Sequence, residues 1–263
     1  MRFITQKNRS ILREMVTTDF KVRYQGSLLG YTWTVLKPLL LFATLYIVFV
    51  KFLRIGGDIP HFPVYLLFGI VLWGFFAETT ATAMTSVVGR ADLIKKVSIP
   101  RYLAVVSGSM SSLINFSINL IVVFIFALIN GVEPMLSWLL LPVFIFELFV
   151  LSTAIGFFLS ALYVKYRDAS YVWEVLLQAA FYATPILYPI TMVAEKYQKI
   201  IMLNPMAQII QDSRWAFVSH QTVSSWKLFD IPVLFIPVTI VIVVTILSVL
   251  YFKSQAKDFA ENI

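Results

Sequence analysis

Long apolar runs recur along the chain, separated by short clusters of charged residues. Six of them are candidate membrane-spanning segments, at 33–53, at 62–88, within 102–132, at 138–164, at 171–188 and at 231–252. A helix needs roughly 20 mostly apolar residues to cross the roughly 30 Å of bilayer hydrocarbon. The fifth run is shorter and is broken by Pro185 and Pro189, so we expect a helix that reaches the far side and then kinks. The pattern predicts an all-α integral membrane protein with six transmembrane helices.

Three other stretches have patterns of their own. Residues 3–22 place apolar and basic side chains at helical spacing, which predicts an amphipathic helix lying flat on an anionic inner leaflet. Residues 190–230 mix charges with apolar runs too short to span a bilayer, and we expect short re-entrant or interfacial helices there. Residues 78–86, ETTATAMTS, are small and polar, so this part of the second run is expected to pack on protein rather than on lipid.

Composition supports the membrane assignment. Hydrophobic residues make up 59% of the 263 residues and charged residues only 13%, and the mean hydropathy is +0.84. A water-soluble domain does not reach these values without exposing apolar surface. We divide the chain into a cytoplasmic interface segment at 1–30, one membrane domain at 31–253 and a cytoplasmic tail at 254–263.

Positive charge gives the orientation. Apart from Lys37, 14 Lys and Arg residues fall on the side that holds both termini and six on the other. Loops rich in Lys and Arg stay in the cytoplasm, so both termini are expected in the cytoplasm of a plasma-membrane protein. The net charge of +7 is explained by this topology, and we expect no nucleic-acid partner. The basic N-terminus has no apolar core or cleavage site of a signal peptide, so we expect it to be retained.

Few side chains are placed for catalysis. The chain has no cysteine and no GxxxxGK[ST] phosphate loop, and His61 and His220 have no neighbouring metal-ligand pattern. We therefore expect no catalytic residue, no metal site and no cofactor on this chain. Glu78, Glu147 and Glu174 fall within apolar runs, where a carboxylate either couples ion movement or is paired within the bundle. The structural role is favoured, and for Glu174 we expect an ion pair beside Arg167.

Two further features remain open from the residues alone. The loop RADLIKKVSIPR, at 90–101, is either a solvated connector or a short helix that docks into a groove on a soluble partner. Aromatic residues make up 16% of the chain, and most of them are expected at the membrane interface or in the core. A minority could stack on sugar rings along a transport path.

These segments together resemble a known family. The junction VRYQGSLLGYTWTVLKPLL, the loop RADLIKKVSIPR, the segment YRDASYVWEVLLQAAFYATPILYP and the later NPMAQIIQDSRWAF resemble the membrane subunit of type-2 ABC exporters of polysaccharides. The likeness covers nearly the whole chain. It is greatest to permeases for rhamnose-containing polysaccharides of Gram-positive bacteria and extends to O-antigen and teichoic acid permeases.

The resemblance implies partners and site residues. It implies a homodimer of this chain with two copies of a separate ATPase subunit, which would bind ATP and Mg. The N-terminal helix would lie at the cytoplasmic interface, and residues 190–230 would gate the outer end of the channel. The loop at about 90–100 would be the coupling helix on the ATPase, through Arg90, Asp92, Leu93, Ile94, Lys95, Lys96 and Pro100. The first and fifth spans would line the polymer path, with Tyr31, Trp33, Tyr46, Trp173, Phe181 and Tyr182 as channel aromatics.

The mechanism implied is ATP-driven export of a polymer attached to undecaprenyl diphosphate, through a channel at the homodimer interface. Lys21, Arg23 and Lys37 would attract the diphosphate at the inner mouth, although positive-inside topology alone also accounts for each of them. Two other functions compete: a type-2 ABC permease for a drug or simple lipid, and a membrane-embedded sugar transferase. An adjacent ATPase gene and rhamnosyltransferase genes would favour polysaccharide export.

Overall fold

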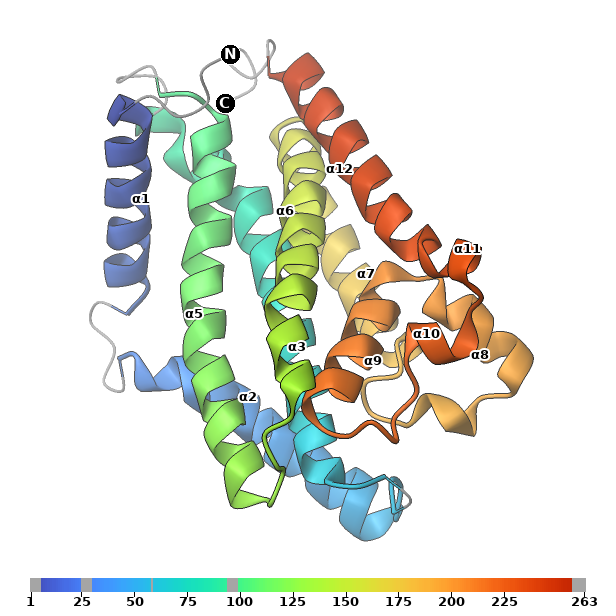
Figure 1. Ribbon diagram of the computed structural model, residues 1–263. Helices are drawn as coiled ribbons and strands as arrows, with labels where there is room; N and C mark the ends of the chain where they lie inside the picture. The colour runs from blue at the N-terminus through green and yellow to red at the C-terminus, as the bar shows by residue number, and fades with distance from the viewer. Residues whose placement is uncertain (1–5, 25–29, 58, 94–98, 257–263) are drawn as a thin grey trace.

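The computed structural model describes residues 6–24, 30–57, 59–93 and 99–256, and every regular element in these ranges is helical (Figure 1). The longer elements are α1 (Gln6–Tyr24), α2 (Thr32–Leu45), α3 (Phe62–Ser86), α5 (Tyr102–Ile129), α6 (Leu141–Lys165), α7 (Ala169–Ala183), α8 (Glu195–Met202), α9 (Pro205–Phe217) and α12 (Ile236–Gln255). Short elements are η1 (Tyr46–Phe52), η2 (Val88–Arg90), η3 (Leu136–Leu140), η4 (Ile190–Met192), α10 (Ser225–Leu228) and α11 (Ile231–Leu234). The predicted all-α membrane fold is confirmed.

Five helical segments are long and apolar enough to cross a membrane: Thr32–Phe52, Phe62–Ser86, Tyr102–Ile129, Leu136–Lys165 and Ile231–Gln255. They match five of the predicted spans closely. The first joins α2 to η1, whose wider π-type turns follow without a break. Pro38 lies inside α2. The number of six spans is not confirmed, because the remaining predicted segment is too short.

That segment is α7, which ends at Ala183 rather than near residue 188 as predicted. Its 15 residues rise only about 22 Å, less than the thickness of the hydrocarbon. The helix stops because Thr184 precedes Pro185, which disfavours helical geometry at Thr184, and Thr184 is extended. The chain then continues through Pro185, Ile186 and Leu187 as buried, non-helical backbone.

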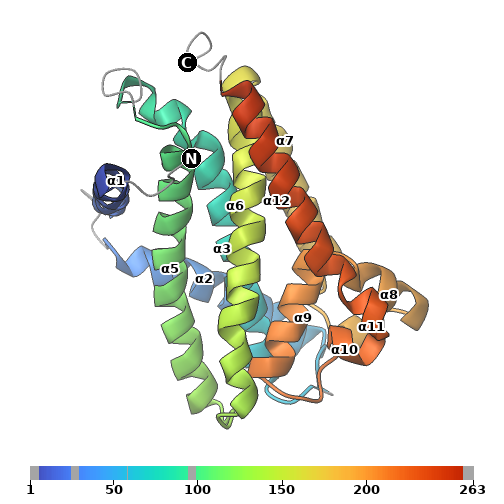
Figure 2. The same ribbon diagram turned by 45° about the horizontal axis from the view of Figure 1, so that its top comes forward.

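The helix α3 is the centre of the bundle, and α2, α5, α6, α7 and α9 all contact it (Figures 1 and 2). In its most apolar stretch 78% of the residues are buried, against none in Thr32–Phe52. Small residues permit the close approach of α6: a Cβ added to Gly156 would lie 2.5 Å from the Cβ of Ala83. Thr79, Thr80 and Ala83 are fully buried. The prediction that residues 78–86 pack on protein is confirmed.

A second apolar cluster marks one end of the bundle, which we call the base. It joins the end of α3, the start of α5, the end of α6 and the end of α12 through Val87, Leu103, Val164 and Phe252. Met15 of α1 is part of it, and Ile11 and Leu12 pack against it. The prediction of an amphipathic helix in this region is confirmed.

Its predicted position, flat on a leaflet, stays a prediction. Asn8 Nδ2 donates to Tyr102 Oη at 3.0 Å, and Ser111 Oγ lies 3.5 Å from Asp19 Oδ2. Asn8 and Asp19 thus meet α5 at Tyr102 and Ser111, and α1 crosses α5 at a steep angle, since Figure 2 looks along α1 while it shows α5 from the side. Ile11, Leu12 and Met15 of α1 pack on protein at the base.

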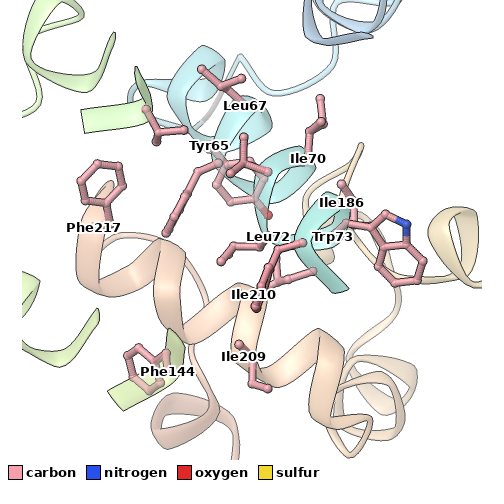
Figure 3. Packing of buried hydrophobic residues seen from close by; sticks show 14 of the residues in the cluster. Tyr65, Leu67, Ile70, Leu72, Trp73, Phe144, Ile186, Ile209, Ile210 and Phe217 are labelled. Atoms are coloured by element: carbon pink, nitrogen blue, oxygen red, sulfur yellow. The ribbon is translucent and has the colours of Figure 1, made fainter. Parts of the chain in front are cut away.

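Short helices precede the last span, as predicted for residues 190–230. Of these, α9 is buried on nearly all sides. Figure 3 shows Ile210 of α9 next to Leu72 of α3, whereas Ile209 lies on the side of α9 near Phe144. The ring of Phe217 packs on Phe68 of α3, with the ring centres 4.8 Å apart. Asn204 caps the start of α9 by accepting from the amide of Met206 at 3.0 Å. At its other end, Ser137 Oγ and Trp138 Nε1 donate to the carbonyls of Ala216 and Phe217.

Candidate functional site

The loop predicted to couple to an ATPase leaves α3 at the base of the bundle. Asp92 and Leu93 are exposed there, as a docking surface requires. Pro100 is half-buried, and its carbonyl accepts from the amide of Leu103 in the first turn of α5. The predicted residues Ile94, Lys95 and Lys96 lie outside the described residues. The docking role of this loop stays a prediction.

Arg90 points back into the protein rather than out toward a partner. Its guanidinium pairs with the carboxylate of Asp19 on α1 and donates to the carbonyls of Ser86 and Ala104, both at 3.3 Å. The two charged side chains are only 17% and 25% exposed. Arg90 therefore links α1, the end of α3 and the start of α5 next to the predicted coupling loop.

Replacing Arg90 by glutamine is expected to loosen α1 from the base. The loss of a partly screened ion pair and two carbonyl contacts should speed amide hydrogen exchange along α1 about five- to tenfold. Exchange measured by mass spectrometry on the purified chain would show this. Lys7→Gln, which removes one exposed charge from the same helix, is the matched control and should leave exchange unchanged. Equal exchange in Arg90→Gln and the wild type would contradict the link.

The three basic residues predicted at the inner mouth lie on two elements. Lys21 is exposed on α1 and Lys37 is exposed on α2, and residues 25–29 between these helices are not described. Arg23 falls near the end of α1, and its side chain is not among those described. Their joint action on a diphosphate stays a prediction.

The six predicted channel aromatics fall into two groups. Trp173 and Phe181 lie on the side of α7 that packs on α3: Trp173 Nε1 donates to Thr80 Oγ1 at 3.0 Å, and the rings of Phe181 and Trp73 are 5.8 Å apart. Tyr46 is half-buried against Phe42. The others are open to the surroundings: Tyr31 is 53%, Trp33 46% and Tyr182 59% exposed.

The three acidic residues in the apolar runs have different surroundings. Glu78 accepts from Asn115 Nδ2 at 2.7 Å, which supports the structural role favoured for it. Glu174 is exposed on α7, and the ion pair expected beside Arg167 is not found among the described residues. Glu147 lies within electrostatic reach of Asp212 and within hydrogen-bonding reach of Gln208, both on α9. The described residues contain no cluster of three or more His, Asp or Glu that could hold a metal.

Arg214 on α9 is the charged residue whose position the sequence did not reveal. Its side chain is fully buried. Nε donates to the carbonyl of Tyr65 at 3.0 Å, and the two terminal nitrogens donate to the carbonyls of Pro185 and Ile186, each at 2.7 Å. The guanidinium carbon lies 3.5 Å from the centre of the Tyr65 ring. We call this arrangement the Arg214 clamp.

The clamp accounts for the non-helical backbone after α7. Carbonyls in a dry interior need donors, and a helix supplies them only to its own residues. Arg214 supplies them to Pro185 and Ile186, and Gln211 Nε2 adds a bond to the Pro185 carbonyl at 3.2 Å. Burial lowers the pKa of Arg214 to about 10, so the side chain remains a cation at neutral pH. One side chain thus fastens α9 to α3 and to the segment after α7.

Asp212 holds the next turn of the chain in place. Its carboxylate accepts from the amide and hydroxyl of Ser225, at 2.7 and 2.6 Å, and from Gln208 Nε2 at 2.8 Å. Burial raises the pKa of Asp212, and these three hydrogen bonds oppose the rise. Asp212 therefore fixes α10 against α9. Since Arg214 fastens α9 to α3, α9 connects α10 to the central helix.

The chain matches the model of a known membrane-protein family over most of its length. Residues 12–218 match the model of the ABC-2 type transporter family. The chain belongs to the ABC-2 type transporter family. The match begins within α1 and ends just after α9, so it includes the central helix, the Arg214 clamp and all of the base except the end of α12.

Individual relatives extend the likeness over almost the full length. The chain is 28% identical over 257 residues to an O-antigen export system permease protein of Myxococcus xanthus, covering 97% of this chain and 96% of that protein. It is 31% identical over 210 residues to an O-antigen export system permease protein of Klebsiella pneumoniae, 80% of each chain. A polysialic acid transport protein of Escherichia coli is 22% identical over 213 residues, 75% of this chain and 77% of that protein.

In the sequence, Arg214 was one of the six Lys and Arg residues on the side opposite the termini, within predicted short helices, and its burial was not foreseen. The signal that could have revealed its position is the stretch PMAQIIQDSRWAF, in which Asp212 and Arg214 stand among apolar residues at helical spacing. Burying a charged side chain in such a helix is unfavourable unless the charge is paired or hydrogen-bonded. Without Arg214, fewer positive charges remain on the side opposite the termini, so the excess of Lys and Arg on the side of the termini, from which the orientation was predicted, becomes larger.

Proposed function

We propose that this chain is the membrane subunit of an exporter that carries a lipid-linked polysaccharide out of the cell. The observation that supports it most directly is the similarity, over 97% of the chain, to a permease named for O-antigen export. The energy would come from ATP and Mg on two copies of a separate ATPase, since the sequence has no phosphate loop of its own. Export in this scheme starts from an undecaprenyl-diphosphate-linked polymer at the cytoplasmic side.

The open face of α7 supports a polar path rather than contact with lipid. Tyr171, Glu174, Gln178 and Tyr182 are exposed along it, with Val172, Val175 and Leu176 exposed among them. An exposed carboxylate facing hydrocarbon would cost about 2.5–3.5 kcal/mol, whereas water or sugar hydroxyls would solvate it. Tyrosine rings offer apolar faces and hydroxyl groups to sugar rings. This face, together with Tyr31 and Trp33 on α2, would line the polymer channel.

A second copy of the chain would close this channel. No residue of α2 or η1 is buried, and Ala169 is the one buried residue of α7. Both helices flank α3 and leave one side uncovered. A homodimer that brings these sides together would enclose the path, while the clamped helices α9 and α10 would stand at its outer end.

Cells that lack this chain are expected to retain the polymer. Surface polysaccharide should fall while polymer accumulates inside, because synthesis continues when export stops. The measurement is immunoblotting of surface and intracellular polysaccharide, with complementation by the wild-type chain.

Complementation by Lys95→Glu/Lys96→Glu should fail through loss of ATPase docking, and complementation by Arg23→Gln/Lys37→Gln should be impaired through weaker diphosphate binding.

Lys196→Gln/Lys199→Gln, which removes two exposed charges on α8, is the control for the neutral double variant and should complement fully. Normal surface polysaccharide without the chain would contradict the proposal. Loss of surface polymer without intracellular accumulation would point to a synthetic role and would also contradict it. Normal export by Arg23→Gln/Lys37→Gln at normal expression would contradict only the proposed binding of the diphosphate by these residues and would leave the export function unaffected.

A further inference from the structure

A groove runs between α1 and α5 near the base of the bundle. It is open along one side and has a volume of about 710 Å³, which is within the range of ligand-binding pockets. We call it the α1–α5 groove. Its lining includes Met110, Leu113 and Ile114 of α5 and Arg9, Leu12 and Arg13 of α1.

The two sides of the groove have different chemistry. The α5 side is apolar apart from Ser117, and Leu12 and Val16 of α1 extend this apolar lining. Arg9 and Arg13 stand one helical turn apart on α1, so both guanidinium groups can reach the same anion. Both side chains are exposed, and neither makes a hydrogen bond or ion pair within the described parts of the chain. An apolar slot with two unpaired cations at its edge is complementary to an anionic amphiphile.

The groove continues into a face of α5 that is open to the bilayer. The exposed apolar residues on this helix include a series at intervals of three, four and seven, formed by Met110, Ile114, Ile121, Ile125 and Leu128. Such spacing places them along one side of the helix. Met110 and Ile114 belong to both the groove and this stripe. An acyl chain could therefore follow the stripe while its headgroup stays at the groove.

We propose that the α1–α5 groove binds one anionic phospholipid of the surrounding bilayer, with its phosphate on Arg9 and Arg13 and an acyl chain against Leu113 and Ile114. Bound there, the lipid would fill the gap between α1 and the bundle and hold the interface helix in place. The Asp19–Arg90 ion pair fastens α1 near its other end. The site is separate from the basic residues proposed for the diphosphate of the export substrate, and it does not depend on the proposed function.

Native mass spectrometry of the full chain in detergent, titrated with phosphatidylglycerol, would test the site. The wild type should retain one tightly bound phosphatidylglycerol per chain and bind phosphatidylcholine more weakly. Arg9→Gln/Arg13→Gln should bind phosphatidylglycerol about 30-fold more weakly, from the attraction of two cations to an anionic headgroup. Lys196→Gln/Lys199→Gln, with the same change in charge at exposed positions of α8, should bind as the wild type does.

A second variant tests the apolar slot without changing charge. Ile114→Trp should fill the groove and remove the bound lipid, whereas Ile125→Trp, on the same exposed stripe outside the groove, should not. Equal retention in the wild type and in Arg9→Gln/Arg13→Gln would overturn the proposal, as would equal losses in the two charge variants. Displacement of phosphatidylglycerol by an equimolar polyprenyl diphosphate would assign the groove to the export substrate and overturn it as well.

Discussion

Replacing Arg214 by methionine is expected to lower the free energy of unfolding by about 3–5 kcal/mol, the cost of breaking a buried charge network. The substitution removes three hydrogen bonds and leaves the carbonyl of Ile186 without the donor that it has in the structure. It also removes the cation from the face of Tyr65, a contact worth about 2 kcal/mol when desolvated. Relief of the desolvation cost of the guanidinium offsets part of this loss. The net effect should be detachment of α9 from α3 and loss of export.

Thermal unfolding of the purified chain in detergent would measure the effect on stability, and surface polysaccharide would measure export. Lys199→Met on α8 is the matched control, because it removes one exposed positive charge nearby and should change neither. Arg214→Lys separates charge from geometry. Lysine keeps the charge but cannot reach three carbonyls in one plane, so an intermediate loss is expected. A stability of Arg214→Met within about 0.5 kcal/mol of the wild type, the range of ordinary surface substitutions, would contradict the role of the clamp.

The spans could be predicted from the sequence because their signal is local. Hydrophobicity over a window of about 20 residues depends only on neighbours in the chain, and five of the predicted spans agree with the structure to within a few residues at each end. The packing of residues 78–86 was predicted for a related reason, since small side chains such as Ala83 allow close approach whichever helix arrives. The break at Pro185 was also correctly expected, although its effect on length was underestimated.

The clamp could not be predicted in this way because its partners are distant in the sequence. Arg214 binds carbonyls 28, 29 and 149 positions away, and Arg90 pairs with a carboxylate 71 positions away. Backbone carbonyls carry no residue-specific signal, so the local pattern around Arg214 could suggest that it is buried but could not indicate its partners. The same holds for Arg90. An arginine at this position suits docking on a partner as well as an ion pair within the chain, so the sequence could not tell the two roles apart. Only the fold shows which groups meet.

Gly69→Ala on α3 is expected to be strongly destabilising, because the added methyl group would collide with the guanidinium of Arg214. A Cβ added to Gly69 would lie 2.1 Å from a terminal nitrogen of Arg214 and 2.9 Å from its guanidinium carbon. That nitrogen cannot move aside easily, because the guanidinium is held by three carbonyls and by the Tyr65 ring. Overpacking of this kind costs about 3 kcal/mol. The opposite result would be expected from helix propensity alone, since alanine is favoured over glycine inside a helix by about 1 kcal/mol.

A double-mutant cycle with Arg214→Met separates these two effects. Without the guanidinium the added methyl has room, so Gly69→Ala should become neutral or stabilise by up to about 1 kcal/mol. Gly74→Ala, at a position of the same helix with nothing within 4 Å of the added Cβ, is the matched control and should be neutral or stabilising in both backgrounds. If Arg214→Met is too unstable to measure, Arg214→Lys provides the second background. An equal cost of Gly69→Ala with and without the arginine would show that Gly69 is required by the helix rather than by the clamp. A coupling of about 3 kcal/mol would instead show that the glycine is needed because the arginine is there.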